Sequence, residues 1–160
     1  MKQITFSDLQ QQSEQAANSP RLRAHRNLHP ELSDPVQRLA IAMEPGTYVR
    51  PHRHPHTFEL LTSLIGRFLV LNFDDEGNVT HRVVLGEDCK VLEMDAGTWH
   101  AVLSLDAGGV IFEVKHGGYQ PVAAGDYVSW APAEGEEGTL ELMEWYRHAE
   151  VGDGGHIRSL

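Results

Sequence analysis

Residues 46–66 read GTYVRPHRHPHTFELLTSLIG and hold the densest group of metal-ligating side chains in the chain. Three of the ten histidines, His52, His54 and His56, fall within five positions, and Glu59 follows shortly after them. Side chains two apart in a β-strand lie on one face, so His52 and His54 can present two imidazoles to one ion. The spacing predicts the first half of a metal site.

Glu59 and His100 complete the predicted ligand set from other strands. Glu59 is an odd number of positions from His54, so on one unbroken strand the two side chains would point to opposite faces. Pro55 cannot donate a ladder hydrogen bond and ends the strand, so Glu59 can enter the site from the next strand. Three imidazoles and one carboxylate suit one divalent transition metal, such as Zn, Fe, Mn or Ni, better than Mg or Ca. The identity of the metal stays open at this point. An alternative ligand set, in which His56 replaces His52, stays open as well.

The segments around this stretch predict a mainly β protein. From residue 36 to residue 114, short apolar and β-branched runs alternate with Gly, Pro, Asp and Asn. The expected strands cover 39–43, 47–49, 58–64, 68–73, 79–85, 91–94, 101–105 and 110–115. Residues 74–78 predict a hairpin loop in which Gly77 can take a positive φ.

Two short helices are expected outside these strands. Residues 7–10 have the spacing of a capping box, and the helical pattern ends at 18–20, Asn-Ser-Pro. Residues 140–146 are the one helical stretch near the C-terminus. At 160 residues the chain predicts one domain, with an N-terminal helix and extended arm (1–35), a barrel core (36–118) and a tail that packs on the barrel (119–160).

Composition excludes several classes of protein. The formal net charge of −10 argues against nucleic-acid binding, because phosphate backbones are held by clustered Lys and Arg. The single cysteine, Cys89, excludes an internal disulfide and a thiolate metal site. No signal peptide or membrane span is evident, so we expect a cytoplasmic protein without membrane partners.

One basic segment stands out in this acidic chain. Residues 21–53 contain six arginines and only three acidic residues. Polar side chains alternate along the extended part of this segment, so they can line the barrel mouth together and bind an anion. Ordinary solvated surface charge is the alternative for each arginine. The candidate substrate-binding residues are Arg21, Arg23, His25, Asn27, His29, Arg38 and Arg53.

Glu113 and His56 are the candidate catalytic residues. Glu113 shares a strand face with Ile111 and Lys115, and lies near the metal if that face is the barrel interior. It could act there as a general base, with a pKa raised by apolar walls or lowered by the cation. A buried Glu113 paired with an arginine is the alternative. His56 lies beside the ligands and is predicted to support them or to contact substrate.

The histidine stretch resembles the first motif of the cupin superfamily, G-x5-H-x-H-x4-E-x6-G, with Gly46, His52, His54, Glu59 and Gly66 in place. The second motif, G-x5-P-x-G-x2-H-x3-N, is matched only by Gly97 and His100, with Cys89, Asp95 and Ser104 at its other positions. The resemblance implies a cupin fold, a double-stranded β-helix or jelly-roll barrel, that binds a metal through the two motifs.

A further resemblance extends from Ser19-Pro20-Arg21 through residues 36–39 and the histidine run to residues 112–115. It is to the WbuC-type cupin metalloproteins, which are often met in bacterial surface-polysaccharide gene clusters. We therefore expect a small anionic sugar derivative as substrate and an isomerase or epimerase activity. An Fe(II)-dependent oxygenase and a non-catalytic sugar-binding module are the alternatives. Exposed edge strands make a homodimer the expected assembly.

Overall fold

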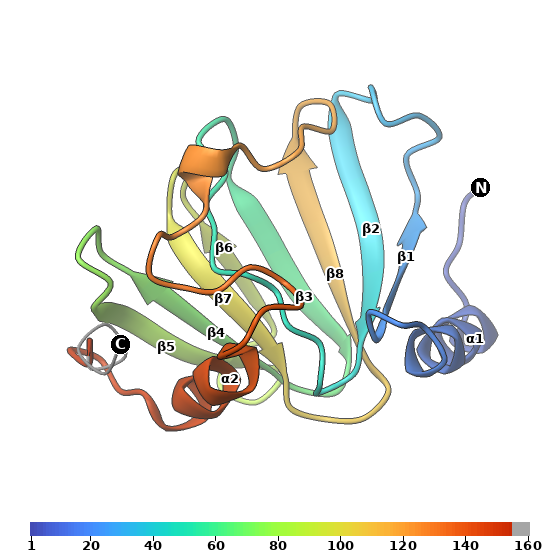
Figure 1. The fold of residues 1–160 in the computed structure, drawn as a ribbon. Coiled ribbons are helices and arrows are strands. Elements are labelled where there is room, and N and C mark those ends of the chain that lie inside the picture. The colour runs from blue at the N-terminus through green and yellow to red at the C-terminus, as the bar shows by residue number, and fades with distance from the viewer. Residues whose placement is uncertain (155–160) are drawn as a thin grey trace.

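A computed structural model describes residues 1–154; residues 155–160, the end of the predicted tail, lie outside the described part. Eight strands lie between two helices along the chain (Figure 1). The elements are α1 Phe6–Ala17, β1 Arg23–Asn27, β2 Val36–Met43, β3 Glu59–Ile65, β4 Phe68–Phe73, β5 Val79–Leu85, β6 Val91–Met94, β7 Trp99–Ser104, β8 Gly109–His116, the 3-10 turn η1 Ala124–Asp126 and α2 Thr139–His148.

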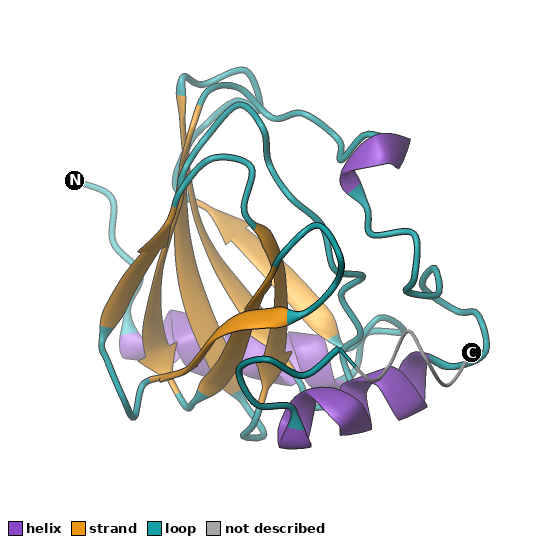
Figure 2. Ribbon diagram, turned by 90° about the vertical axis from the view of Figure 1, so that its left-hand side faces the viewer, coloured by secondary structure: helices purple, strands orange, loops and turns teal. Residues whose placement is uncertain are grey.

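The strands form two antiparallel sheets that face each other (Figure 2). One sheet has the order β1-β2-β8-β3-β6, and the other has the order β5-β4-β7. Apolar side chains from both sheets meet in the space between them, among them Met43, Leu61, Phe68, Leu85 and Ile111. This inward face is the one that the alternation of polar and apolar residues predicts.

Helix α1 covers the outer face of β1, β2 and β8. Ala24, Ala40 and Ala42 are buried beneath it, and these small side chains allow a close approach. The amide of Gln12 donates to the carbonyls of Ala24 and Ala40 at 2.9 and 2.8 Å. The helix begins earlier than predicted, because Thr5 is its N-cap and forms the capping box with Asp8.

Helix α2 packs against the smaller sheet through Leu142, Met143 and Tyr146, which are all buried. It extends beyond the predicted 140–146 by one or two residues at each end. Arg82 of β5 donates to the carbonyls of Tyr146, Arg147 and Ala149 and so satisfies the C-terminal end of the helix.

Leu142→Ala is expected to reduce the free energy of unfolding by about 2–5 kcal/mol, because the buried side chain leaves a cavity. Leu142 is 0% exposed, whereas Leu140 on the same helix is 71% exposed. Leu140→Ala is the matched control and should change stability by roughly 0.5 kcal/mol or less. Urea denaturation measures both variants, and equal losses would show that α2 does not pack as described.

The strand expected at residues 47–49 is absent, and this prediction was wrong. The segment is a loop, held by a hydrogen bond from the Thr47 hydroxyl to the Leu22 carbonyl at 2.6 Å and from the Tyr48 hydroxyl to the Pro132 carbonyl at 2.7 Å. Contacts with distant loops have replaced strand pairing, although the residues themselves favour a strand. The hairpin loop at 74–78 is as predicted, with Gly77 at φ 84°.

Candidate metal centre and substrate cavity

The backbone brings the histidine stretch to β7. His52 and His100 exchange two backbone hydrogen bonds, of 3.1 and 2.9 Å, in an isolated antiparallel bridge. Glu59 is the first residue of β3, on the sheet opposite β7. Pro55 lies in the turn between His54 and Glu59, and this turn lets both side chains enter the same interior space.

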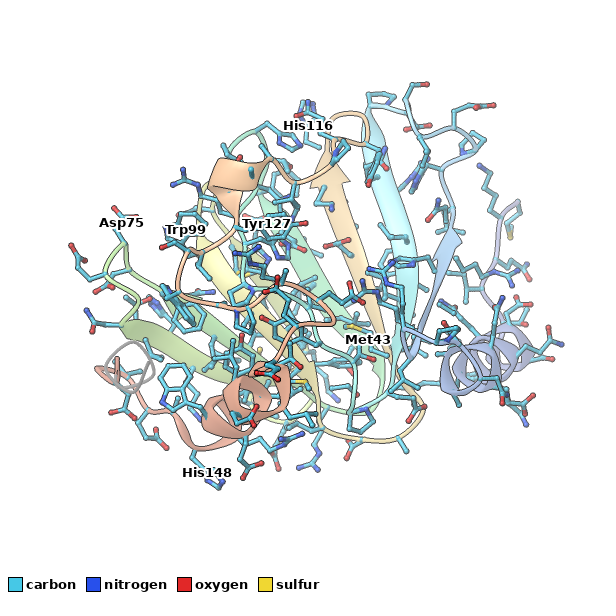
Figure 3. All side chains as sticks on the ribbon, in the orientation of Figure 1. Met43, Asp75, Trp99, His116, Tyr127 and His148 are labelled. Atoms are coloured by element: carbon cyan, nitrogen blue, oxygen red, sulfur yellow. The ribbon has the colours of Figure 1, made fainter. Side chains whose placement is uncertain are left out.

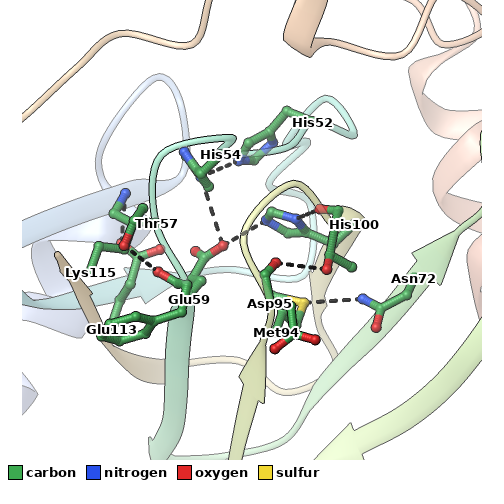
Figure 4. Close-up of polar contacts among 12 residues, drawn as sticks. His52, His54, Thr57, Glu59, Asn72, Met94, Asp95, His100, Glu113 and Lys115 are labelled. Atoms are coloured by element: carbon green, nitrogen blue, oxygen red, sulfur yellow. Dashed lines mark hydrogen bonds and ion pairs between the residues drawn. The ribbon is translucent and has the colours of Figure 1, made fainter.

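The side chains of His52, His54, Glu59 and His100 point toward one another (Figure 4). The Nε2 atoms of His52 and His54 are 3.1 Å apart. One carboxylate oxygen of Glu59 lies 2.8 Å from Nε2 of His100 and 3.7 Å from Nε2 of His54. Potential ligand atoms of the three histidines all lie within 4.8 Å of one another, so this cluster can hold one metal ion.

Backbone carbonyls set the orientation of two of the imidazoles. Nδ1 of His52 lies 2.8 Å from the carbonyl of Arg50, and Nδ1 of His100 lies 2.9 Å from the carbonyl of Thr98. A carbonyl only accepts, so each Nδ1 carries the proton that it donates. In the neutral form of each ring the lone pair then remains on Nε2, which points into the cluster, as in histidine ligands of metals.

Burial lowers the pKa of His52 to about 3, and the nearby His100 adds to the effect. Burial also lowers the pKa of His54 to about 4. Burial disfavours the charged forms of Glu59 and His100 as well, yet each favours the charge of the other. The pKa of Glu59 is therefore well below its ordinary value, and that of His100 is raised. Neutral His52 and His54 beside an ionised Glu59 form a donor set suited to a cation.

Glu59 supplies the observation that tests this fit. Its side chain is 8% exposed, and its buried Oε2 atom faces Nε2 of His100 at 2.8 Å. When His100 is neutral, its Nε2 presents a lone pair to this oxygen, and a cation between the two atoms would satisfy both. The predicted ligand set therefore fits a divalent ion with nitrogen and oxygen ligands.

His56 lies outside this cluster. It is exposed, and its ring centroid is 6.3 Å from that of His54. His56 instead lines a small recess together with Arg53 and residues 120–123. The geometry thus favours the ligand set with His52 and His54, and it places His56 beside the ligands rather than among them.

A cavity of about 390 Å³ opens from the cluster between the two sheets. The cluster forms one part of its wall, and Met43 and Tyr127, labelled in Figure 3, form others. Tyr127 belongs to residues 119–138, which we call the strap and which connect the end of β8 to the start of α2 (Figure 1). Residues 119–122 of the strap also line the cavity. The backbone of the strap is hydrogen-bonded to the loop that carries His52 and His54, which we call the ligand loop. The amide of Val128 donates to the carbonyl of Pro51, and the amide of Arg53 donates to the carbonyl of Asp126.

Glu113 and Lys115 both face this cavity from β8, as their alternation with Ile111 predicts. The carboxyl group of Glu113 is within hydrogen-bonding reach of the carboxyl group of Glu59. The Nζ atom of Lys115 lies 3.5 Å from Oε2 of Glu113. Burial and the Glu59 carboxylate raise the pKa of Glu113 well above its ordinary value. The partner of Glu113 is thus a carboxyl group and a lysine, and not an arginine.

Three of the predicted substrate-binding residues line the cavity, namely Arg21, Arg23 and His25. Alternate residues of the arm face inward as expected, whereas Ala24 faces α1. Glu134 of the strap binds both arginines, with oxygens 2.8 Å from Arg21 and 3.1 Å from Arg23. Nothing in the local sequence indicates this partner, because Glu134 lies more than one hundred positions away.

The other four predicted residues do not line this cavity. Asn27 lies on a separate surface hollow, and His29 is 4% exposed and accepts a hydrogen bond from the backbone of Arg38 at 2.9 Å. Arg38 has the opposite strand parity to Ile41 and pairs with Asp34 at 3.4 Å. Arg53 donates to Asp126 at 2.8 Å, with its guanidinium 4.2 Å above the ring of Trp99. These four residues have structural contacts of their own or lie outside the cavity, so we remove them from the candidate substrate site.

Solved structures of low sequence identity share this arrangement of strands. KdgF from Halomonas sp. is 12% identical, with 64% of this chain and 85% of that chain covered and a TM-score of 0.50. A recombinant oxalate oxidase in complex with glycolate is 15% identical over 89% of this chain and 72% of that chain, with a TM-score of 0.54. BH2720 from Bacillus halodurans is 20% identical, with 70% of this chain and 82% of that chain covered and a TM-score of 0.52.

The two sheets, the helices at each end and these neighbours define a cupin-fold protein, in which a three-histidine cluster is able to bind a metal ion. Residues 4–85 match the profile of a family described as a domain of unknown function, DUF6016, and the chain belongs to that family. No curated protein matches the chain in sequence. Among the described residues, neither helix is long and apolar enough to span a membrane.

Proposed function

We propose that this protein is a metal-dependent enzyme that transfers a proton within a small sugar derivative, as an isomerase or epimerase. The observation that carries the proposal is the position of Glu113, a buried carboxyl group that faces the same cavity as the metal cluster. A divalent ion held by His52, His54, Glu59 and His100 would polarise a carbonyl or hydroxyl oxygen of the substrate as a Lewis acid.

Glu113 has the surroundings that proton transfer at carbon requires. It removes a proton from the hydroxyl-bearing carbon next to the substrate carbonyl. It then returns a proton to the former carbonyl carbon, as the hydroxyl proton moves to the former carbonyl oxygen, or to the other face of the same carbon. A carboxyl group whose pKa is raised by burial is suited to hold this proton between the two steps. The apolar walls, which include Ile41, Leu61 and Ile111, favour the uncharged form of Glu113 while it holds the proton.

The resemblance to WbuC-type cupins supports a sugar building block of surface polysaccharide as the substrate. A homodimer stays a prediction, as does a cytoplasmic location. We retain His56 as a residue that supports the ligand loop, because it is exposed in the recess beside His54.

Incubation of the metal-loaded protein with aldoses, ketoses and sugar acids in deuterium oxide tests the proposal. We expect proton NMR to show metal-dependent loss of the signal at a carbon next to a carbonyl. Oxygen consumption by the iron-loaded protein without such exchange would favour the oxygenase. Saturable binding without exchange or oxygen consumption under any metal would favour a non-catalytic binding module.

A further inference from the structure

The cationic side chains of the cavity differ in how strongly protein groups already bind them. Arg21 donates from Nε and Nη2 to the two oxygens of Glu134, at 2.9 and 2.8 Å. Arg23 donates from Nη2 to Glu134 at 3.1 Å and from Nη1 to the carbonyl of Tyr48 at 3.2 Å. Both arginines thus fasten the strap to the arm, and a ligand would have to displace Glu134 to reach them.

Lys115 is held less firmly. Its only ion pair in the described part of the chain is with Glu113, and the 3.5 Å distance exceeds the about 2.7–3.2 Å of a well-formed hydrogen bond. The side chain is 20% exposed and lines the cavity. An ammonium group offers three donors, so Lys115 retains the capacity to bind a ligand.

Lys115 lies beside the metal cluster and within electrostatic reach of the arm. Its backbone is paired with that of Glu59, and Figure 4 shows it with Glu113 on the side of Glu59 away from His100. Burial lowers the pKa of His25, and the charges of Arg21 and Lys115 lower it further. These effects favour the neutral form of His25, which lines the same cavity as Lys115 and can exchange hydrogen bonds with hydroxyl groups there.

The charges next to the cluster do not cancel in the metal-loaded protein. With neutral imidazoles, a divalent ion and the Lys115 ammonium carry three positive charges, whereas Glu59 and Glu113 together supply two negative charges at most, so at least one positive charge is left over. A desolvated excess charge of this kind favours a ligand with one negative charge. The volume of about 390 Å³ is near the lower end of ligand pockets, roughly 300–1,000 Å³, and suits a monosaccharide better than a nucleotide sugar.

We propose that Lys115 is the anion-binding residue of the cavity and that the ligand is a hydroxy acid or keto acid of monosaccharide size. Its carboxylate pairs with Lys115, while its hydroxyl or carbonyl oxygens lie against the histidine cluster. This inference rests on the proposed function for the presence of the metal and names the substrate class for the same site. The anion-binding group is thus Lys115 on β8, and not the arginines of the arm that the sequence predicts.

Calorimetric titration of the Zn(II)-loaded protein with D-glucuronate and with D-glucuronamide tests this assignment, because the two probes differ in charge at nearly equal shape. We expect wild type to bind the acid roughly tenfold or more tightly than the amide, as a charged hydrogen bond implies. Lys115→Met should reduce this ratio to near one, and Lys115→Arg should retain a preference for the acid. Zinc content and circular dichroism establish that each variant is folded and loaded.

Arg38→Gln is the matched control, since Arg38 pairs with Asp34 and does not line the cavity. It should retain the preference for glucuronate within about threefold. Loss of the preference in Arg38→Gln but not in Lys115→Met would overturn the proposal, as would failure of wild type to bind the acid. Tighter binding of glucose 1-phosphate than of glucuronate would overturn the carboxylate assignment. Glucuronate binding through Lys115 without deuterium exchange would refute the proposed reaction and leave this inference standing.

Discussion

His100→Ala is expected to lower the affinity for a divalent transition metal by about 100-fold or more, since loss even of a group that only supports a ligand costs roughly 10–100-fold. His100 is 3% exposed, and its Nε2 atom points at the buried oxygen of Glu59. Alanine removes this nitrogen and leaves the Glu59 carboxylate without its neighbour. Titration of the metal-free protein with Zn(II) against a competing chelator measures the change.

His56→Ala is the matched control for this prediction. His56 belongs to the same histidine run but is exposed and lies outside the cluster. Its replacement should change the affinity for Zn(II) by roughly tenfold at most, which is the lower range for a supporting residue. A large loss in His56→Ala together with unchanged binding in His52→Ala would show that the alternative ligand set is the correct one.

Glu113→Gln is expected to slow metal-dependent deuterium exchange by about 10²–10⁴-fold, the usual contribution of a positioned acid or base. Glutamine has nearly the same shape but cannot take up the proton. The metal content should remain the same, because Glu113 faces the cavity beside Glu59 and is not among the predicted ligands. Proton NMR in deuterium oxide and metal analysis of the same sample separate the two effects.

Glu113→Asp provides a second variant at this position. A shorter carboxyl group can still carry a proton but is displaced from the substrate carbon, so we expect an intermediate rate. Exchange at the wild-type rate in Glu113→Gln would assign the proton transfer to another group. Loss of the metal in that variant would instead make Glu113 part of the metal site.

The parts of the site that follow from local alternation could be predicted from the sequence. His52, His54, Glu59 and His100 were expected together and lie together in the structure. Their spacing matches a known motif and the parity of short strands, and these are properties of neighbouring residues. The inward direction of Glu113 follows from the same period of two.

Contacts between distant segments could not be predicted in this way. The sequence of the strap shows no strong helical or strand periodicity. Its contribution to the cavity wall and the salt bridge between Glu134 and Arg21 are therefore seen only in the structure. Asn27 has the predicted parity but does not line the cavity, where the inward arm residues are Arg23 and His25. Parity predicts a direction along a straight strand and cannot predict where that strand leaves the site.

Arg38 shows a signal in the sequence that was available but was outweighed by charge. Its parity is opposite to that of Ile41 and Met43, which face the cavity, so it lies on the same side of β2 as the alanines under α1. The parity of Gln37 is the inward one, and its amide donates to the carbonyls of Leu32 and Asp34. In β2, the alternation of apolar side chains predicts correctly which residues face the cavity, whereas the positive charge of Arg38 does not.

Location of the metal by anomalous X-ray scattering, in crystals of the protein purified without chelator or affinity tag, tests the central claim most directly. We expect one peak between His52, His54 and His100, at about 2.0–2.2 Å from each Nε2 atom and with an oxygen of Glu59 beside it. No peak there after addition of Zn(II), or a peak held by other residues, would contradict the metal centre and the functions that depend on it.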